Sequence, residues 1–200
     1  MPTTSRGHMH RKVRQFADSI ILAARSMADR QTGSHAPSTD VNARLFALLQ
    51  SEHNYRRIWR LASHPMLPPT RRPRRGCVPF LTAALGQVGV EVPRTARIDG
   101  LAVARVTLGL ARFLEEKLCW RRIERVAALR PGDVIFTRDA PGCPGMPDHV
   151  FVFMGWADRT GAVALAVDDQ GYTHPRSLFP APDAAHNSAS SAFGFGLRTP

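Results

Sequence analysis

Three residue types in this sequence could together perform nucleophilic catalysis. Catalysis by cysteine needs a thiolate, an imidazole that exchanges a proton with it, and a polar group that orients the imidazole. Cys77 stands where a segment rich in proline and arginine gives way to an apolar stretch, and His149 and Asp168 lie at the ends of two successive apolar runs. We expect these three side chains to meet if the segments that carry them pack together.

The apolar stretch at 77–85 predicts a helix that begins at Cys77, with Gly86 and Gly89 after it as stop signals. At a helix N-terminus the dipole favours a negatively charged sulfur. Pro79 agrees with this placement, because proline is tolerated in the first turn, where its missing N–H has no intrahelical partner.

His149 opens the run at 150–154, and Asp168 follows the run at 162–167. Both runs are short and bounded by turn residues, which is typical of strands. If they form a hairpin, its register could bring the carboxylate beside the imidazole. Strand alternation points Asp168 and Asp169 to opposite faces, so a regular strand allows only one of them to meet His149.

The remaining pattern predicts an α+β protein, with helices packed on a small antiparallel sheet. Helical periodicity is found first and short strands follow. The expected helices are at 11–29, from residue 40 until prolines begin at Pro65, at 77–85 and at 101–120, and the expected strands are at 134–137, 150–154, 162–167 and 192–197. Asp40, Ser38 or Thr39 could cap the second helix.

Positive charge is concentrated in the N-terminal third of the chain. Residues 1–75 contain 14 of the 27 basic residues and 4 of the 16 acidic ones. We divide the chain into a basic helical extension at 1–70 and a second domain at 71–200. An arginine-rich arm of this kind would be attracted to an anionic polymer, such as nucleic acid, acidic lipid or cell-wall material, and charge alone does not choose among them.

Composition excludes several other classes of protein. No run of about 18 apolar residues predicts a membrane span, and charged residues interrupt the only N-terminal stretch that could resemble a secretion signal. Three cysteines, Cys77, Cys119 and Cys143, are too few for a disulfide scaffold, and no Cys-x-x-Cys pair predicts a zinc site. We predict neither a metal nor a cofactor.

Four segments resemble motifs of the NlpC-like cysteine peptidases, which are related to the CHAP amidases, and occur in the same order. They are GCVPF at 76–80, GVEVPRT at 89–95, LRPGDVIF at 129–136 and HVFVFMG at 149–155. The resemblance implies a papain-like fold and a bacterial or phage enzyme that cuts peptide or amide bonds, most often in the stem peptides of peptidoglycan.

The same resemblance implies roles for single residues. It makes Cys77 the nucleophile and His149 the general base. The segment Val167-Asp168-Asp169-Gln170 is similar to the CHAP arrangement of an acid followed two positions later by an amide. This favours Asp168 as the orienting residue and Gln170 as an auxiliary polar contact, with Asp169 as the alternative acid.

The nucleophile motif departs from the family pattern, because Gly76 replaces the usual aspartate and Val78-Pro79 replaces Ser-Gly. A competing hypothesis is therefore a papain-like binding protein without turnover, whose arginine-rich arm contacts nucleic acid or an anionic membrane. Cys143 and His174 are interpreted as loop residues, although His174 could border the substrate cleft.

Overall fold

The computed structural model describes residues 40–62, 76–158, 161, 163–179 and 192–200. The chain divides into two compact units, 1–38 and 39–200, and all of the described residues belong to the second. This division falls earlier in the chain than the boundary expected at residue 70. The helix expected at 11–29 and the arginine tract at 71–75 lie outside the described residues.

The helices precede most of the strands, as predicted. They are α2 (Val41–Leu49), α3 (Glu52–Ala62), α4 (Cys77–Gln87) and α5 (Thr107–Arg112), which a π-helical turn at Phe113–Lys117 continues. Asp40 caps α2, since its Oδ1 accepts the N–H of Asn42 at 2.8 Å. A single helix was expected in this region, but the chain turns between α2 and α3, where the Ser51 hydroxyl accepts the N–H of Asn54 at 3.4 Å.

A six-stranded antiparallel sheet follows, in the order β3-β8-β4-β5-β6-β7. Its strands are β3 (Arg121–Ile123), β4 (Val134–Thr137), β5 (Val150–Trp156), β6 (Val163–Asp168), β7 (Gly171–Ser177) and β8 (Phe193–Arg198). Helices together with an antiparallel sheet confirm the predicted α+β class. The sequence pattern predicts β4, β5, β6 and β8 but not β3 and β7.

A small hairpin replaces the first part of the helix that was expected at 101–120. Strands β1 (Arg97–Ile98) and β2 (Leu101–Ala102) pair through a turn at Asp99 and Gly100. Both turn residues have positive φ, 49° and 79°, which is the conformation of a type I′ hairpin turn and explains the Asp-Gly pair. The helix therefore starts only at Thr107.

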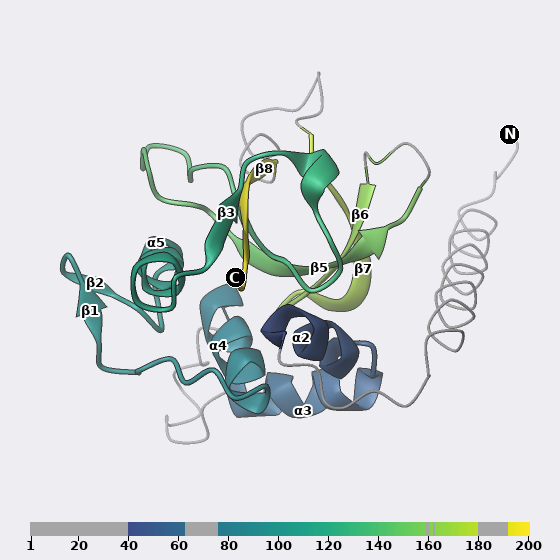
Figure 1. Cartoon of the computed structure of the whole chain (residues 1–200), viewed down its shortest axis with the longest axis horizontal. Helices are drawn as coiled ribbons and strands as arrows, with labels where there is room; N and C mark the ends of the chain where they lie inside the picture. Colours follow the sequence, from purple (N-terminus) through teal and green to yellow (C-terminus); the bar gives the residue numbers. More distant parts are fainter. Residues whose placement is uncertain (1–39, 63–75, 159–160, 162, 180–191) are drawn as a thin grey trace, which may run out of the picture. The chain divides into compact units, whose positions relative to one another are not determined.

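Apolar side chains cover both faces of the sheet. On one face, Val134, Val150, Val152 and Val167 belong to the same buried cluster as the apolar residues of α2, α3 and α4; Figure 1 shows these three helices grouped on one side of the strands. On the other face, Ile135, Phe151, Phe153 and Ala166 belong to a second cluster. The ends of the strands are thus held in place from both sides.

The LRPGDVIF segment has a structural role at the start of β4. Gly132 has φ +93°, and a Cβ there would lie 2.1 Å from the carbonyl oxygen of Asn42 in α2. The Asn42 side chain donates to the Gly132 carbonyl at 2.8 Å. The next residue, Asp133, is fully buried and accepts two hydrogen bonds from the guanidinium of Arg198, at 2.6 and 2.7 Å. These contacts join α2, β4 and β8.

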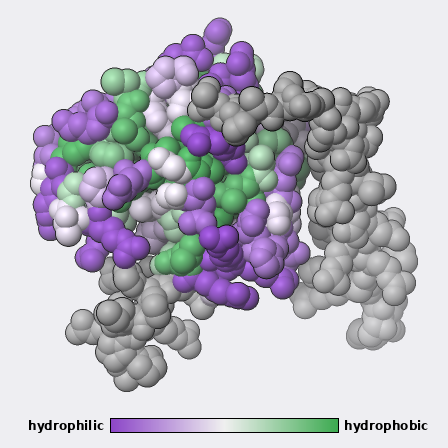
Figure 2. Space-filling view, turned by 60° about the horizontal axis from the view of Figure 1, so that its bottom comes forward, coloured by the Kyte–Doolittle hydropathy of each residue, from purple (hydrophilic) through white to green (hydrophobic). Residues whose placement is uncertain are grey.

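The helix side of this unit carries exposed arginines on α3, at Arg56, Arg57 and Arg60. Figure 2 brings this side forward and shows apolar patches separated by hydrophilic ones. Within the part of the chain that the structure describes, no helix combines the length and the apolar character needed to cross a lipid bilayer.

Candidate functional site

Cys77 is the first residue of α4, as the sequence predicted. The preceding Gly76 has extended backbone, with φ −148° and ψ 150°, and its carbonyl accepts the first helical hydrogen bond, from the N–H of Phe80 at 3.1 Å. The apolar face of α4 is buried, whereas Cys77 itself is half-buried. Its sulfur is therefore accessible at the positive end of the helix dipole.

His149 lies immediately before β5 and is held by Thr137 at the end of β4. The Thr137 hydroxyl accepts the N–H of His149 at 2.9 Å, and the His149 carbonyl accepts the N–H of Thr137 at 3.0 Å. The imidazole is largely buried, with 11% of its side chain exposed. Its ring lies 6.4 Å from that of Phe151, between centroids. The end of the β4–β5 pair thus fixes the position of the ring.

Asp168 ends β6 and meets the imidazole. Its Oδ2 lies 2.7 Å from His149 Nε2, and its side chain is fully buried. The register of β5 and β6 pairs Val152 with Val167. Val167 packs into the cluster with the helices, so the residue after it is directed to the opposite face. The predicted hairpin therefore brings the acid and the imidazole together.

The ionisation of His149 and Asp168 follows from these contacts. Burial lowers the pKa of His149, but hydrogen bonds to Asp168 and to the Cys77 thiol outweigh it and raise the pKa to about 9. Burial raises the pKa of Asp168, but hydrogen bonds to His149 and His174 outweigh it and hold that pKa far below its usual range. Since Asp168 occupies Nε2, Nδ1 is the ring nitrogen left for the thiol. Cys77, His149 and Asp168 thus form one connected set.

Asp169 lies near this set but does not replace Asp168. Its Oδ1 is buried without a hydrogen-bond partner, and burial together with the charge of Asp168 raises its pKa. Gln170 is placed as an auxiliary contact: its N–H donates to Asp168 Oδ1 at 2.8 Å. The geometry thus distinguishes the two acids that the sequence left as alternatives.

Two further residues of the site lie on β7, and the sequence did not predict that either would contact Asp168. His174, interpreted as a loop residue, places its Nε2 2.9 Å from Asp168 Oδ1. Arg176 donates from Nη2 to Asp168 Oδ2 at 3.1 Å. The signal was weak because Pro175 stands between them. Proline usually argues against a strand, but it is tolerated at a sheet edge, and β7 is an edge strand. His174 and Arg176 flank Pro175 and therefore share one face of this strand.

Donor atoms of His149, Asp168 and Asp169 lie within 4.8 Å of one another and have the chemistry of metal ligands. However, the Asp168 carboxylate already accepts four hydrogen bonds, two on each oxygen. One of the donors is the guanidinium of Arg176, whose positive charge would repel a metal cation. The cluster fits an acid–imidazole pair better than a metal site.

The other two cysteines do not share this environment. Cys119 and Cys143 are both exposed and unpaired. Cys143 forms part of a turn, in which its N–H donates to the Ala140 carbonyl at 2.9 Å. Cys77 alone among the three stands at the start of a helix and contacts an imidazole.

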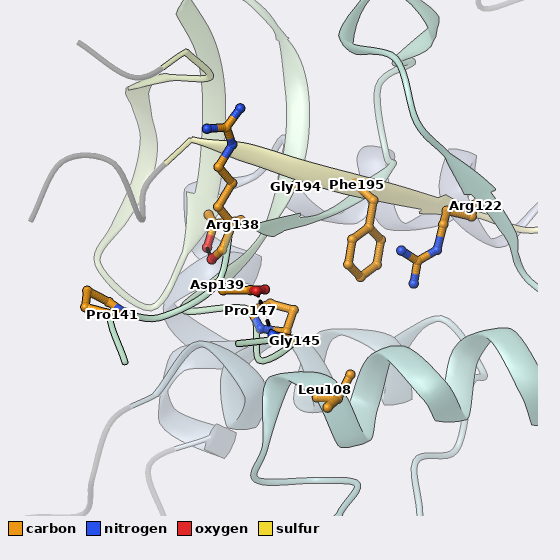
Figure 3. Close-up of a pocket in the computed structure, with 10 residues that line it drawn as sticks. Leu108, Arg122, Arg138, Asp139, Pro141, Gly145, Pro147, Gly194 and Phe195 are labelled. Carbon is orange, nitrogen blue, oxygen red and sulfur yellow. Dashed lines mark hydrogen bonds between the residues drawn. The ribbon is translucent and has the colours of Figure 1, made fainter. Parts of the chain in front are cut away.

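A hollow of about 650 Å³ lies around the end of β4 and the β4–β5 loop (Figure 3). Its lining residues come from α5, β3, the end of β4, the β4–β5 loop and β8 and are Leu108, Arg122, Thr137, Arg138, Asp139, Pro141, Gly145, Pro147, Gly194 and Phe195. Figure 3 shows Phe195 and Arg122 above Leu108 of α5, and the Arg122 guanidinium lies 3.6 Å from the Phe195 ring centroid. Thr137 connects this hollow to His149, although Cys77 and Asp168 do not line it.

Comparisons with protein-family models, with curated proteins and with solved structures found no match for this chain. The geometry of the site therefore carries the functional argument.

Proposed function

We propose that this protein is a cysteine hydrolase with a papain-like fold, which cleaves peptide or amide bonds through Cys77, His149 and Asp168. One observation carries the proposal: the buried imidazole of His149 has a helix-terminal thiol as one partner and a buried carboxylate, 2.7 Å from Nε2, as the other. An imidazole whose pKa is raised to about 9 is protonated at neutral pH and can stabilise a neighbouring thiolate.

In the first half of the reaction the Cys77 thiolate attacks the substrate carbonyl carbon, and the carbonyl oxygen becomes an oxyanion. Backbone N–H groups in the first turn of α4 have no intrahelical acceptor and can stabilise that charge. Pro79 removes one such donor, which leaves those of Cys77 and Val78. The His149 imidazolium then gives its proton to the departing amine, the C–N bond breaks, and a thioester with Cys77 remains.

In the second half, neutral His149 takes a proton from a water molecule as that water attacks the thioester carbonyl. The C–S bond breaks, a carboxylic acid is released, and the thiolate–imidazolium pair is restored. Asp168 holds the imidazole in one tautomer and stabilises its charged form throughout. Because this carboxylate accepts hydrogen bonds on both oxygens, its orientation is fixed before substrate arrives.

The substrate that we propose is the peptide of bacterial peptidoglycan, on the strength of the four motifs that resemble NlpC-like peptidases. The hollow of about 650 Å³ is lined by none of Cys77, His149 and Asp168 and therefore does not bear on this choice of substrate.

The test is mass spectrometry of peptidoglycan fragments after incubation with the wild type and with Cys77→Ala. We expect the wild type to release new peptide termini, the Cys77→Ala variant to release none, and Cys143→Ala, which removes an exposed thiol, to match the wild type. Turnover by Cys77→Ala would refute the role of the thiol. A wild type that is inactive, and whose Cys77 is alkylated no faster than Cys119 and Cys143, would favour the binding-protein alternative.

A further inference from the structure

The Asp168 carboxylate is fully buried and saturated with hydrogen-bond donors. Oδ2 accepts from His149 Nε2 at 2.7 Å and from Arg176 Nη2 at 3.1 Å. Oδ1 accepts from the N–H of Gln170 at 2.8 Å and has His174 Nε2 at 2.9 Å. Of these donors, the guanidinium is the one that carries a positive charge at every pH at which proteins fold.

The position of Arg176 is not explained by the hydrogen-bonding needs of its own side chain, because one of its N–H groups has no partner. Its side chain is 11% exposed and lies over the Phe151 ring, 5.1 Å from the centroid. Nη2 also donates to Gln170 Oε1 at 3.0 Å, but Nε is buried without a partner. A buried, unpaired N–H costs free energy. The compensating feature is the contact between the guanidinium and the Asp168 carboxylate.

Arg176 adds a positive charge to the ionisable groups around the imidazole. The ionisable groups that face it are Tyr55 from α3, Cys77 from α4, Asp168 and Asp169 from the end of β6, and His174 and Arg176 from β7. A thiolate–imidazolium pair is neutral overall, so it does not cancel the negative charge of ionised Asp168, whose side chain is fully buried. Such a charge is strongly disfavoured unless a cation pairs with it.

We propose that Arg176 is a positioning residue of the hydrolase, whose guanidinium shares Asp168 Oδ2 with His149 and offsets the charge of that carboxylate while the thiolate–imidazolium pair forms. This inference rests on the proposed function. Arg176 contacts Asp168, not the thiol or the substrate carbonyl, and acts through that carboxylate on the imidazole.

The experiment measures the rate at which iodoacetamide alkylates Cys77 in the full chain as a function of pH. A thiolate–imidazolium pair gives two transitions, a lower one as the pair forms and an upper one as the imidazolium loses its proton. Three variants are compared with the wild type: Arg176→Met, which keeps an apolar contact over Phe151; Arg176→Gln, which keeps a donor; and Arg176→Lys, which keeps the charge.

Removal of a positive charge that shares Oδ2 with the imidazolium makes protonation of His149 easier. We therefore expect Arg176→Met and Arg176→Gln to move the upper transition, which reports His149, upward by about one pH unit, and Arg176→Lys to keep it within a few tenths of a unit of the wild type. If Arg176→Met does not fold, Arg176→Gln carries the test.

Arg198→Met is the matched control, because Arg198 pairs with the other buried acid, Asp133. It should lower stability and leave both transitions in place. Arg176 variants that behave in the same way, or that move the transitions downward, would overturn the proposal. Alkylation needs no substrate, so a wild type that cleaves nothing defeats the proposed function without affecting this result.

Discussion

The substitution Asp168→Asn tests the electrostatic core of the site, because it removes one charge and keeps an oxygen that can accept from His149 Nε2. In the wild type the pKa of His149 is raised from 6.5 to about 9, although burial opposes this. At 1.36 kcal/mol per pKa unit, the elevation corresponds to about 3 kcal/mol of net preference for the imidazolium. Asp168 and Cys77 supply that preference together.

Without the carboxylate charge, Cys77 alone opposes the effect of burial, which lowers the pKa of His149. We expect the pKa of His149 to fall by about two units, within the range that a neighbouring opposite charge produces. Proton–nitrogen NMR spectra of the histidine rings, recorded as pH is varied, measure this pKa directly, and the His149→Gln variant assigns the signal. The measurement needs no substrate.

Asp169→Asn is the control for the same experiment, since Asp169 is the next residue yet does not accept the hydrogen bond from the His149 ring. It should move the pKa of His149 by less than half as much. The reasoning is refuted if Asp168→Asn leaves that pKa near 9, or if the two substitutions have equal effects.

Three further predictions concern stability, measured by urea denaturation. Gly132→Ala should destabilise the protein by about 3 kcal/mol or more, because φ is +93° and the new Cβ would lie 2.1 Å from the Asn42 carbonyl oxygen. Arg198→Leu should cost about 3–5 kcal/mol, since it leaves the fully buried Asp133 without its cation. The stability that protonated His149 contributes should be complete below pH 6.5 and be lost as pH rises towards 9, by up to about 3 kcal/mol, and the His149→Gln variant should lack this slope.

The sequence predicted Cys77, His149 and Asp168 as site residues because each stands at the end of a helix or strand whose limits are marked by neighbouring residues. An apolar stretch with Pro79 in its first turn predicts a helix start at Cys77, and that is where α4 begins. Turn residues bound the runs that became β5 and β6, which places His149 and Asp168 at their ends. Local chemistry was sufficient for these features, since none depends on a distant partner.

The choice between Asp168 and Asp169 needed tertiary information. Alternation shows that the two side chains diverge, but it does not show which face meets the imidazole. The pairing of Val152 with Val167 across β5 and β6 settles this, because Val167 is buried with the helices and Asp168 is directed to the opposite face.

The edge strand β7 was also not predicted, because it is defined by its pairing with β6 and not by its own sequence pattern. Its residues are mostly half-buried or exposed, so no apolar alternation marks them, and Pro175 argues against a strand in any position except an edge. Thr173 has φ +42°, which further breaks the regular pattern. Only pairing with β6, which places Ala166 opposite His174 and Ala164 opposite Arg176, turns this segment toward Asp168.

Cys77, His149 and Asp168 were predictable from local sequence whereas the residues of β7 were not, because a buried carboxylate depends on partners from elsewhere in the fold. A strand end and an apolar neighbour can be predicted from local sequence, but an acid with no exposed surface must also receive donors and a positive charge from elsewhere in the fold. Asp168 obtains both from β7, eight or fewer residues further along the chain. The chain is rich in arginine, so composition cannot indicate which guanidinium contacts Asp168. The β6–β7 pairing does indicate it, because Arg176 lies opposite Ala164. The orientation of the acid is thus a property of the β6–β7 hairpin as a whole, and substitutions that shift that hairpin should impair His149 even when Cys77, His149 and Asp168 are unchanged.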